Sequence, residues 1–213
     1  LPLIEYISKK NKPIILSTGM ASIKEIEDAV NVIKKFSKND LILFHCISSY
    51  PTPTDKSNLN NISYLREKFN VNIGLSDHTL NNTAALVAIG LGAIAIEKHF
   101  KIDDEVCGPD SSFSLNIKQL KSLVHNSKEA WLSKGSNNFQ RADIEKNSTI
   151  FRRSLYFIKD LDRGHVIKRE DIKRIRPGFG LEPKYFEDVV GSTLKNKVER
   201  GDPIKWDFLS KKK

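Results

Sequence analysis

The stretch VNIGLSDHT, residues 71–79, indicates the fold more clearly than any other part of the chain. An apolar run, Val71–Leu75, is followed at once by four polar residues and then by Ala84–Leu91, which we expect to form a helix. A short apolar run without alternating polar residues is typical of a strand buried on both faces. The stretch therefore predicts a buried strand, a polar turn and a covering helix.

The same order of strand, polar turn and helix occurs on both sides of this stretch. The predicted strands are Pro13–Leu16, Leu41–Cys46, Val71–Leu75 and Ala93–Ile96, and the predicted helices are Ile23–Phe36, Leu59–Phe69, Ala84–Leu91 and Ile117–Leu132. Ser22 and Glu25 have the spacing of a capping box at the start of the first long helix.

Strands that alternate with helices predict an α/β fold with a parallel sheet. A doubly wound sheet and a (β/α)8 barrel share this pattern, and four strand–helix units amount to half a barrel. Both folds build their active sites at the carboxyl ends of the strands. Polar residues just after each predicted strand are therefore candidates for a site.

The last third of the chain differs in pattern and in charge. We expect residues 1–132 to form the α/β part, the polar residues 133–150 to form a linker, and residues 151–213 to form a small β-rich module with short strands separated by Gly and Pro. Residues 1–150 carry 18 basic and 16 acidic side chains, whereas residues 151–213 carry 17 and 10. Most of the net charge of +9 therefore belongs to the second module.

Composition excludes several classes of protein. A chain that is 39% hydrophobic and 29% charged is typical of a globular protein, and its longest apolar runs fall short of the roughly 20 residues of a membrane span. The two cysteines, Cys46 and Cys107, are too few for a disulfide framework and suit a reducing cytoplasm. The basic module lacks the interleaved aromatics of an RNA-binding domain, so we expect neither a nucleic-acid nor a membrane partner.

Three of the five histidines, His45, His78 and His99, fall at or just after predicted strand ends. A single histidine there is more often structural, but His78 and His99 follow neighbouring strands and could converge on one divalent cation. Asp77 and Glu97 lie beside them in sequence, so each could orient a ligand, and Glu97 could also be a site carboxylate. A metal site and a structural role both remain open from spacing alone.

Other loops on this edge carry weaker signals. Ser17-Thr18-Gly19 before a helix could cradle an anion or simply cap the helix. Gly108-Pro109-Asp110 could present a carboxylate or form a plain turn. Tyr50 lies in a polar, proline-rich loop, where it could bind a hydroxylated ligand or only pack.

Several ordered motifs resemble one family, the nonulosonate synthases, which make sialic, legionaminic and pseudaminic acids. The barrel motifs are KPIILSTGM (12–20), FHCISSYPTP (44–53), GLSDHT (74–79), IEKHF (96–100) and GPDSSFSL (108–115). The motifs RRSLY, KDLDRG, RPGFGLEPKYFEDVVG and GDPIKWD resemble the family's C-terminal SAF (antifreeze-like) domain. The resemblance implies strands five to eight of a TIM barrel followed by the SAF domain.

The resemblance also implies an activity and a set of site residues. The reaction is the condensation of phosphoenolpyruvate with an N-acetylated amino sugar, which releases phosphate and gives a nine-carbon acid for a cell-surface glycan. His78 and His99 match the ligands of a divalent metal, most often Mn with Mg or Co as alternatives, and act in catalysis with Glu97. Ser17 and Ser76 match hydroxyls that bind phosphoenolpyruvate. Tyr50, Glu97 and Asp110 match residues on the sugar side. Arg176 matches an arginine that one subunit inserts into its partner's site in a domain-swapped homodimer.

Details of the motifs favour one substrate without excluding others. RPGFGLEPKY, GPDSSFS and KWD are most similar to pseudaminic acid synthases, whereas FHCISSYPTP is closer to the sialic and legionaminic type. Ser48-Ser49 stand where some sialic acid synthases have an asparagine before the loop tyrosine. A non-catalytic carbohydrate- or anion-binding protein on the same scaffold is the alternative of a different class. Because a half barrel has open strand edges, we expect the segment alone to be inactive and poorly soluble.

Overall fold

The computed structural model describes residues 1–102 and 108–210, which form two compact units, Leu1–Ser136 and Asn137–Lys213. Cys107 and the last three lysines, which were part of the sequence predictions, lie outside the described residues. In the described part, no helix combines the length and the apolar character that crossing a membrane requires.

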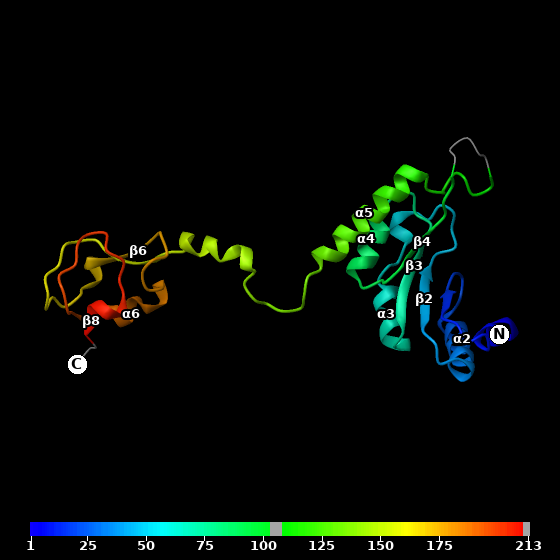
Figure 1. Cartoon of the computed structure of the whole chain (residues 1–213), viewed down its shortest axis with the longest axis horizontal. Helices are drawn as coiled ribbons and strands as arrows, with labels where there is room; N and C mark the ends of the chain where they lie inside the picture. The colour runs from blue at the N-terminus through cyan, green and yellow to red at the C-terminus, as the bar shows by residue number, and fades with distance from the viewer. Residues whose placement is uncertain (103–107, 211–213) are drawn as a thin grey trace. The chain divides into compact units, whose positions relative to one another are not determined.

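The first unit contains an open parallel sheet, and helices alternate with its strands along the chain (Figure 1). The four strands pair side by side in the order β1-β2-β3-β4, which is the arrangement of half a barrel. Its elements are α1 (Pro2–Ser8), β1 (Ile14–Ser17), α2 (Ile23–Phe36), β2 (Leu41–Cys46), the 3-10 turn η1 (Thr54–Lys56), α3 (Asn61–Phe69), β3 (Asn72–Asp77), α4 (Thr83–Gly90), β4 (Ile96–Lys98) and α5 (Ile117–Ser133).

One face of this sheet is covered by the helices. Alternate strand residues such as Leu43 and Ile73 are fully buried against apolar residues of α2, α3 and α4. The opposite face would line the inside of a barrel and is more open, since Ile15 is 60% exposed and Glu97 is also exposed. Side chains that could meet a substrate therefore come from the second face.

Most predicted elements are confirmed, and β4 is the main difference. The predicted strand was Ala93–Ile96, whereas β4 comprises Ile96–Lys98. The earlier residues do bond to β3, through Ile94 N to Ile73 O and Leu75 N to Ala95 O, but the ladder continues two residues further than the apolar run. The strand thereby extends into the polar residues that carry the candidate site.

The second unit is a small β-rich module with its own apolar core. Its regular elements are the 3-10 turns η2 (Asp143–Glu145) and η3 (Asn147–Phe151), β5 (Ser154–Phe157), η4 (Arg169–Asp171), β6 (Ile172–Ile175), η5 (Pro183–Tyr185), α6 (Phe186–Val189), β7 (Thr193–Leu194), η6 (Trp206–Phe208) and β8 (Leu209–Ser210). β5 pairs with β6 and β7 with β8, both antiparallel. Leu155, Phe157 and Ile204 are fully buried in its core.

Candidate active site

The end of β3 and the end of β4 bring His78 and His99 together. Their ring centroids lie 5.3 Å apart with the ring planes at 65°. His78 is buried, whereas about a third of the His99 side chain is exposed. Two imidazoles at this separation on one edge of the sheet can converge on a small ligand between them.

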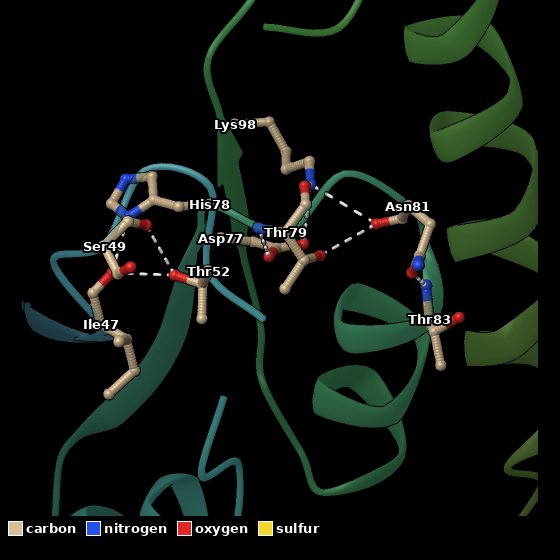
Figure 2. Close-up of polar contacts among 9 residues, drawn as sticks. All are labelled: Ile47, Ser49, Thr52, Asp77, His78, Thr79, Asn81, Thr83 and Lys98. Carbon is tan, nitrogen blue, oxygen red and sulfur yellow. Dashed lines mark hydrogen bonds and ion pairs between the residues drawn. The ribbon is translucent and has the colours of Figure 1, made fainter. Parts of the chain in front are cut away.

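Backbone carbonyl contacts define the orientation of His78 (Figure 2). Its Nδ1 lies 2.9 Å from the carbonyl oxygen of Ile47, which can only accept a hydrogen bond, so Nδ1 carries a proton and, in the neutral ring, Nε2 keeps its lone pair. The backbone of His78 is held as well, because its carbonyl accepts from Thr52 N at 2.9 Å. The Thr52 hydroxyl lies 2.8 Å from the carbonyl of Ser49 and thereby closes this loop.

Asp77 makes no recorded bond to the His78 ring, contrary to one of the sequence interpretations. Successive strand residues face opposite sides of a sheet, so Asp77 points away from the imidazole. Its carboxylate accepts a hydrogen bond from Thr79 N at 2.8 Å and pairs with Lys98 Nζ at 3.0 Å. The partner of the His78 ring is instead a carbonyl of the preceding loop.

Ser76 and Glu97 form a second pair on the same face as the two histidines. They are direct neighbours across the β3–β4 ladder, and the Ser76 hydroxyl lies 2.7 Å from Glu97 Oε1. Ser76 is buried and Glu97 is exposed. A hydroxyl and a carboxylate therefore stand next to the two imidazoles.

Aromatic rings surround the histidine pair. The Tyr50 ring lies 4.2 Å from that of His78 and 5.3 Å from that of Phe113, which in turn is 5.0 Å from His99. Sequence reasoning assigned no role to Phe113, although an apolar residue in the otherwise polar loop GPDSSFS was a usable signal. Tyr50 is half exposed and Phe113 is buried, and both rings lie beside the imidazoles.

The loop that carries Asp110 is attached to the end of β4. Leu115 N donates to the His99 carbonyl at 2.8 Å, and Leu115 bridges to Phe100. This attachment places Asp110 Oδ2 at 3.4 Å from His99 Nδ1. Asp110 thus places a carboxylate beside the His99 ring.

The loop after β1 supplies Ser17 but not the expected cradle. Ser17 is exposed at the end of β1, whereas the Thr18 hydroxyl donates to the Phe44 carbonyl at 2.9 Å and is therefore not free for an anion. The helix is capped by Ser22, not by this loop, as the capping box predicted. A Cβ at Gly19 would lie 2.4 Å from Ser48 Oγ, so glycine allows this loop to lie against the β2 loop.

Two predicted residues lie outside this cluster. His45 is buried, its Nε2 donates to the Ser57 carbonyl at 2.8 Å, and burial lowers its pKa, so it is a structural histidine. Arg176 belongs to the second unit, where it is exposed just after β6.

The donor atoms around the pair suit a divalent cation. The tautomer of His78 leaves Nε2 available, and neutral imidazole is a ligand for Mn, Fe, Co and Zn. Residues 1–102 and 108–210 contain no group of three or more His, Cys, Asp and Glu with the geometry of a closed metal site. The arrangement in the described residues is thus a pair of imidazoles without a third such ligand beside them.

Comparison with known proteins gives matches in both parts of the chain. Residues 1–139 match the NeuB family and residues 152–210 match the SAF domain. The chain is 37% identical over 202 residues to a pseudaminic acid synthase of Campylobacter jejuni, covering 95% of this chain and 59% of that protein. It is 33% identical over 214 residues to an N,N'-diacetyllegionaminic acid synthase of Legionella pneumophila, covering 98% and 60%.

A solved structure agrees with the half barrel. The N-acetylneuraminic acid synthetase of Leptospira borgpetersenii, in complex with citrate, superposes with a TM-score of 0.65 and 35% identity over 69% of this chain and 51% of that chain. The chain spans about 60% of the length of the two curated relatives described above.

Proposed function

The chain belongs to the NeuB family, and from this premise we propose that the intact protein condenses phosphoenolpyruvate with an N-acetylated amino sugar. The reaction joins the enol carbon to the sugar aldehyde carbon, adds water and releases phosphate, giving a nine-carbon 2-keto acid. The single observation that carries the proposal is the convergence of His78 and His99 beside the Ser76–Glu97 pair.

His78 and His99 would hold a divalent cation, which we propose to be Mn²⁺, with Mg²⁺ or Co²⁺ as alternatives. Such a cation would polarise the aldehyde oxygen of the sugar. The chain's own contribution is to fix the His78 ring through the Ile47 carbonyl, so that Nε2 faces the ligand.

The Ser76–Glu97 hydrogen bond suggests how phosphoenolpyruvate is received. The single hydroxyl proton of Ser76 is directed at Glu97, which leaves Ser76 unable to donate elsewhere. Donation to an anionic oxygen of phosphoenolpyruvate requires the hydroxyl to turn away from Glu97. Binding of this substrate then releases the Glu97 carboxylate to interact with the sugar, and Ser17 supplies a second hydroxyl for phosphoenolpyruvate.

We assign the sugar side of the site to Tyr50, Glu97 and Asp110. Tyr50 is half exposed beside His78, and Asp110 stands beside His99, so both can meet a hydroxylated ligand. Arg176 completes the site in this proposal by reaching it from the partner subunit of a domain-swapped homodimer. A buried, unpaired thiol at Cys46 suits a reducing compartment and supports a cytoplasmic location.

We propose that the product is pseudaminic acid, with legionaminic and N-acetylneuraminic acid as alternatives. The motifs RPGFGLEPKY and GPDSSFS support this choice. The pseudaminic acid synthases among the relatives are 35–37% identical to the chain and the N,N'-diacetyllegionaminic acid synthases 33–35%, so the choice depends on the motifs more than on overall identity.

The decisive experiment incubates the intact protein with phosphoenolpyruvate, Mn²⁺ and, in turn, the amino-sugar precursors of the three acids. We expect phosphate release only when a sugar and the cation are both present, with a product of matching mass from the pseudaminic precursor. His78→Ala and His99→Ala should each lower the rate at least ~100-fold, because a metal ion contributes several kcal/mol to transition-state stabilisation.

Two results would contradict the proposal. Calorimetric binding of a sugar without any phosphate release would instead identify a carbohydrate-binding protein on this scaffold. Full activity of both histidine variants would exclude the assigned metal ligands.

A further inference from the structure

Asp77 and Lys98 form a buried ion pair at the strand ends that carry the two histidines. Lys98 Nζ lies 3.0 Å from Asp77 Oδ2, and the two side chains are only 2–3% exposed. Every other ion pair recorded for the described residues has at least one side chain that is substantially exposed to solvent. A salt bridge this well buried is unusual enough to require an explanation.

The pair is too fully hydrogen-bonded to act on a substrate. Lys98 Nζ donates to Asp77 and to the carbonyl oxygens of Thr79 and Asn81, so its three protons are all directed at the protein. The other carboxylate oxygen of Asp77 accepts from Thr79 N. Figure 2 shows Lys98 pointing toward the loop of Thr79 and Asn81, which leads into α4.

Along the two strands, the Asp77–Lys98 pair lies between the Ser76–Glu97 pair and the His78–His99 pair. Asp77 is the direct neighbour of Lys98, as Ser76 is of Glu97 one position earlier. His78 and His99 follow one position later, on the same face as Ser76 and Glu97. The ion pair therefore joins β3 to β4 from the covered face, at the level where the open face carries the two imidazoles.

On the basis of the proposed function, we infer that Asp77 and Lys98 are positioning residues that set the separation and orientation of His78 and His99. β4 is only three residues long, so few ladder hydrogen bonds hold its end against β3. The four hydrogen bonds of the Asp77–Lys98 pair restrict the two strand ends to one arrangement, whereas an apolar contact would allow them to slide past each other. The pair thus supplies the rigidity that a two-imidazole site needs.

The test compares Mn²⁺ binding to variants of the intact protein by isothermal titration calorimetry and electron paramagnetic resonance. Lys98→Met alone leaves a buried carboxylate unpaired and should lower the unfolding temperature. The informative variant is Asp77→Asn/Lys98→Met, which removes both charges and keeps an acceptor for Thr79 N. We expect it to unfold near the wild-type temperature and to bind Mn²⁺ about 10–100-fold more weakly, as for other residues that support metal ligands.

The matched control is Asp28→Asn/Lys24→Met, which neutralises an exposed pair at 2.9 Å on α2 and should leave Mn²⁺ binding unchanged.

His78→Ala and His99→Ala test the site itself and should abolish binding. If they do so while Asp77→Asn/Lys98→Met binds Mn²⁺ like the wild type, the positioning role is wrong and the proposed metal site stands. If the histidine variants bind normally, the site and the positioning role both fail. Loss of folding in the double variant would make the pair a stability element and would overturn the inference.

Discussion

Gly74 allows the neighbouring chain segments of the sheet to lie unusually close together. It lies directly opposite Phe44 across the β2–β3 ladder, and the Phe44 ring covers the space where a side chain would be. A Cβ at this position would lie 2.4 Å from the ring and 2.9 Å from the carbonyl oxygen of Ala95. The close approach of β2, β3 and the chain before β4 therefore depends on the absence of a side chain.

We predict that Gly74→Ala destabilises the first unit. The buried Phe44 ring must move or the strands must separate, and such overpacking costs about 1–3 kcal/mol. For a chain of this size the unfolding temperature should fall by several degrees, at ~2–4 °C per kcal/mol. Differential scanning calorimetry of the intact protein measures the change.

Gly90→Ala is the matched control for this substitution. Gly90 ends α4, and apart from its chain neighbours and the backbone of its own helix no atom lies within 4 Å of the place a Cβ would occupy. Alanine there should leave the stability unchanged or raise it by up to ~1 kcal/mol. Equal effects of the two substitutions would show that steric contact at Gly74 is not the reason for its glycine.

At the scale of elements, η4 and β6 depend on one buried carboxylate. Asp171 accepts hydrogen bonds from Lys159 Nζ and His165 Nε2, both at 2.8 Å, and from Lys168 N at 2.9 Å. Burial raises the pKa of Asp171, but these hydrogen bonds outweigh it and lower the pKa to about 2. Asp171 thereby joins the loop of residues 159–168 to the start of β6.

We predict that this module loses stability in acid through Asp171. Its folded pKa lies below the ordinary value of 3.8, so the carboxylate stabilises the fold fully above about pH 4. That contribution, about 2 kcal/mol, is lost as the pH falls from about 4 to about 2. Asp171→Asn should remove it at neutral pH and should make the module less sensitive to pH in that range.

Hydrogen exchange of peptides covering residues 154–175, in the intact protein, follows this effect without interference from the first unit. Glu187→Gln is a suitable control, because it alters an ion pair with Arg169 in which both side chains are mostly exposed. Such surface pairs contribute little, so exchange should be unchanged. Wild-type exchange in Asp171→Asn at pH 7 would contradict the prediction.

Comparing these elements with the sequence shows which signals are local. The helix Ile23–Phe36 was predicted with both ends correct, because its capping box and apolar spacing lie within the helix itself. The end of β4 was not, because its polar residues Glu97 and Lys98 belong to the strand through their pairing with β3. Contacts between distant segments leave no periodic pattern in the sequence.

The candidate site follows the same rule. The strand ends predicted that His78 and His99 would be neighbours, and the structure places their rings 5.3 Å apart. The interpretation of Asp77 as a direct partner of His78 was wrong, because the predicted strand ended at Leu75 whereas β3 continues to Asp77, so that Asp77 and His78 face opposite sides of the sheet. Phe113 was missed because only the folded loop brings it to the imidazoles.

At the scale of the whole molecule, the proposed function requires both units in one site. His78 belongs to the first unit and Arg176 to the second. If Arg176 acts in the partner's site, a dimer of one His78→Ala chain and one Arg176→Ala chain contains one site with both residues intact. If Arg176 acts within its own chain, neither site of that dimer is intact.

We therefore predict that the two inactive variants complement each other. With different affinity tags on the two chains, purified mixed dimers should show about half of the wild-type kcat per dimer, because one of two symmetric sites is restored. Phosphate release from phosphoenolpyruvate in the presence of the sugar and Mn²⁺ is the measurement.

Mixed dimers of His78→Ala with His99→Ala are the control, since both changes lie in the same unit and every site lacks a histidine. Recovery in the first pair and none in the second, with Arg176→Ala homodimers inactive, would establish the action of Arg176 across the dimer, whereas equal inactivity of both pairs would restrict Arg176 to its own chain.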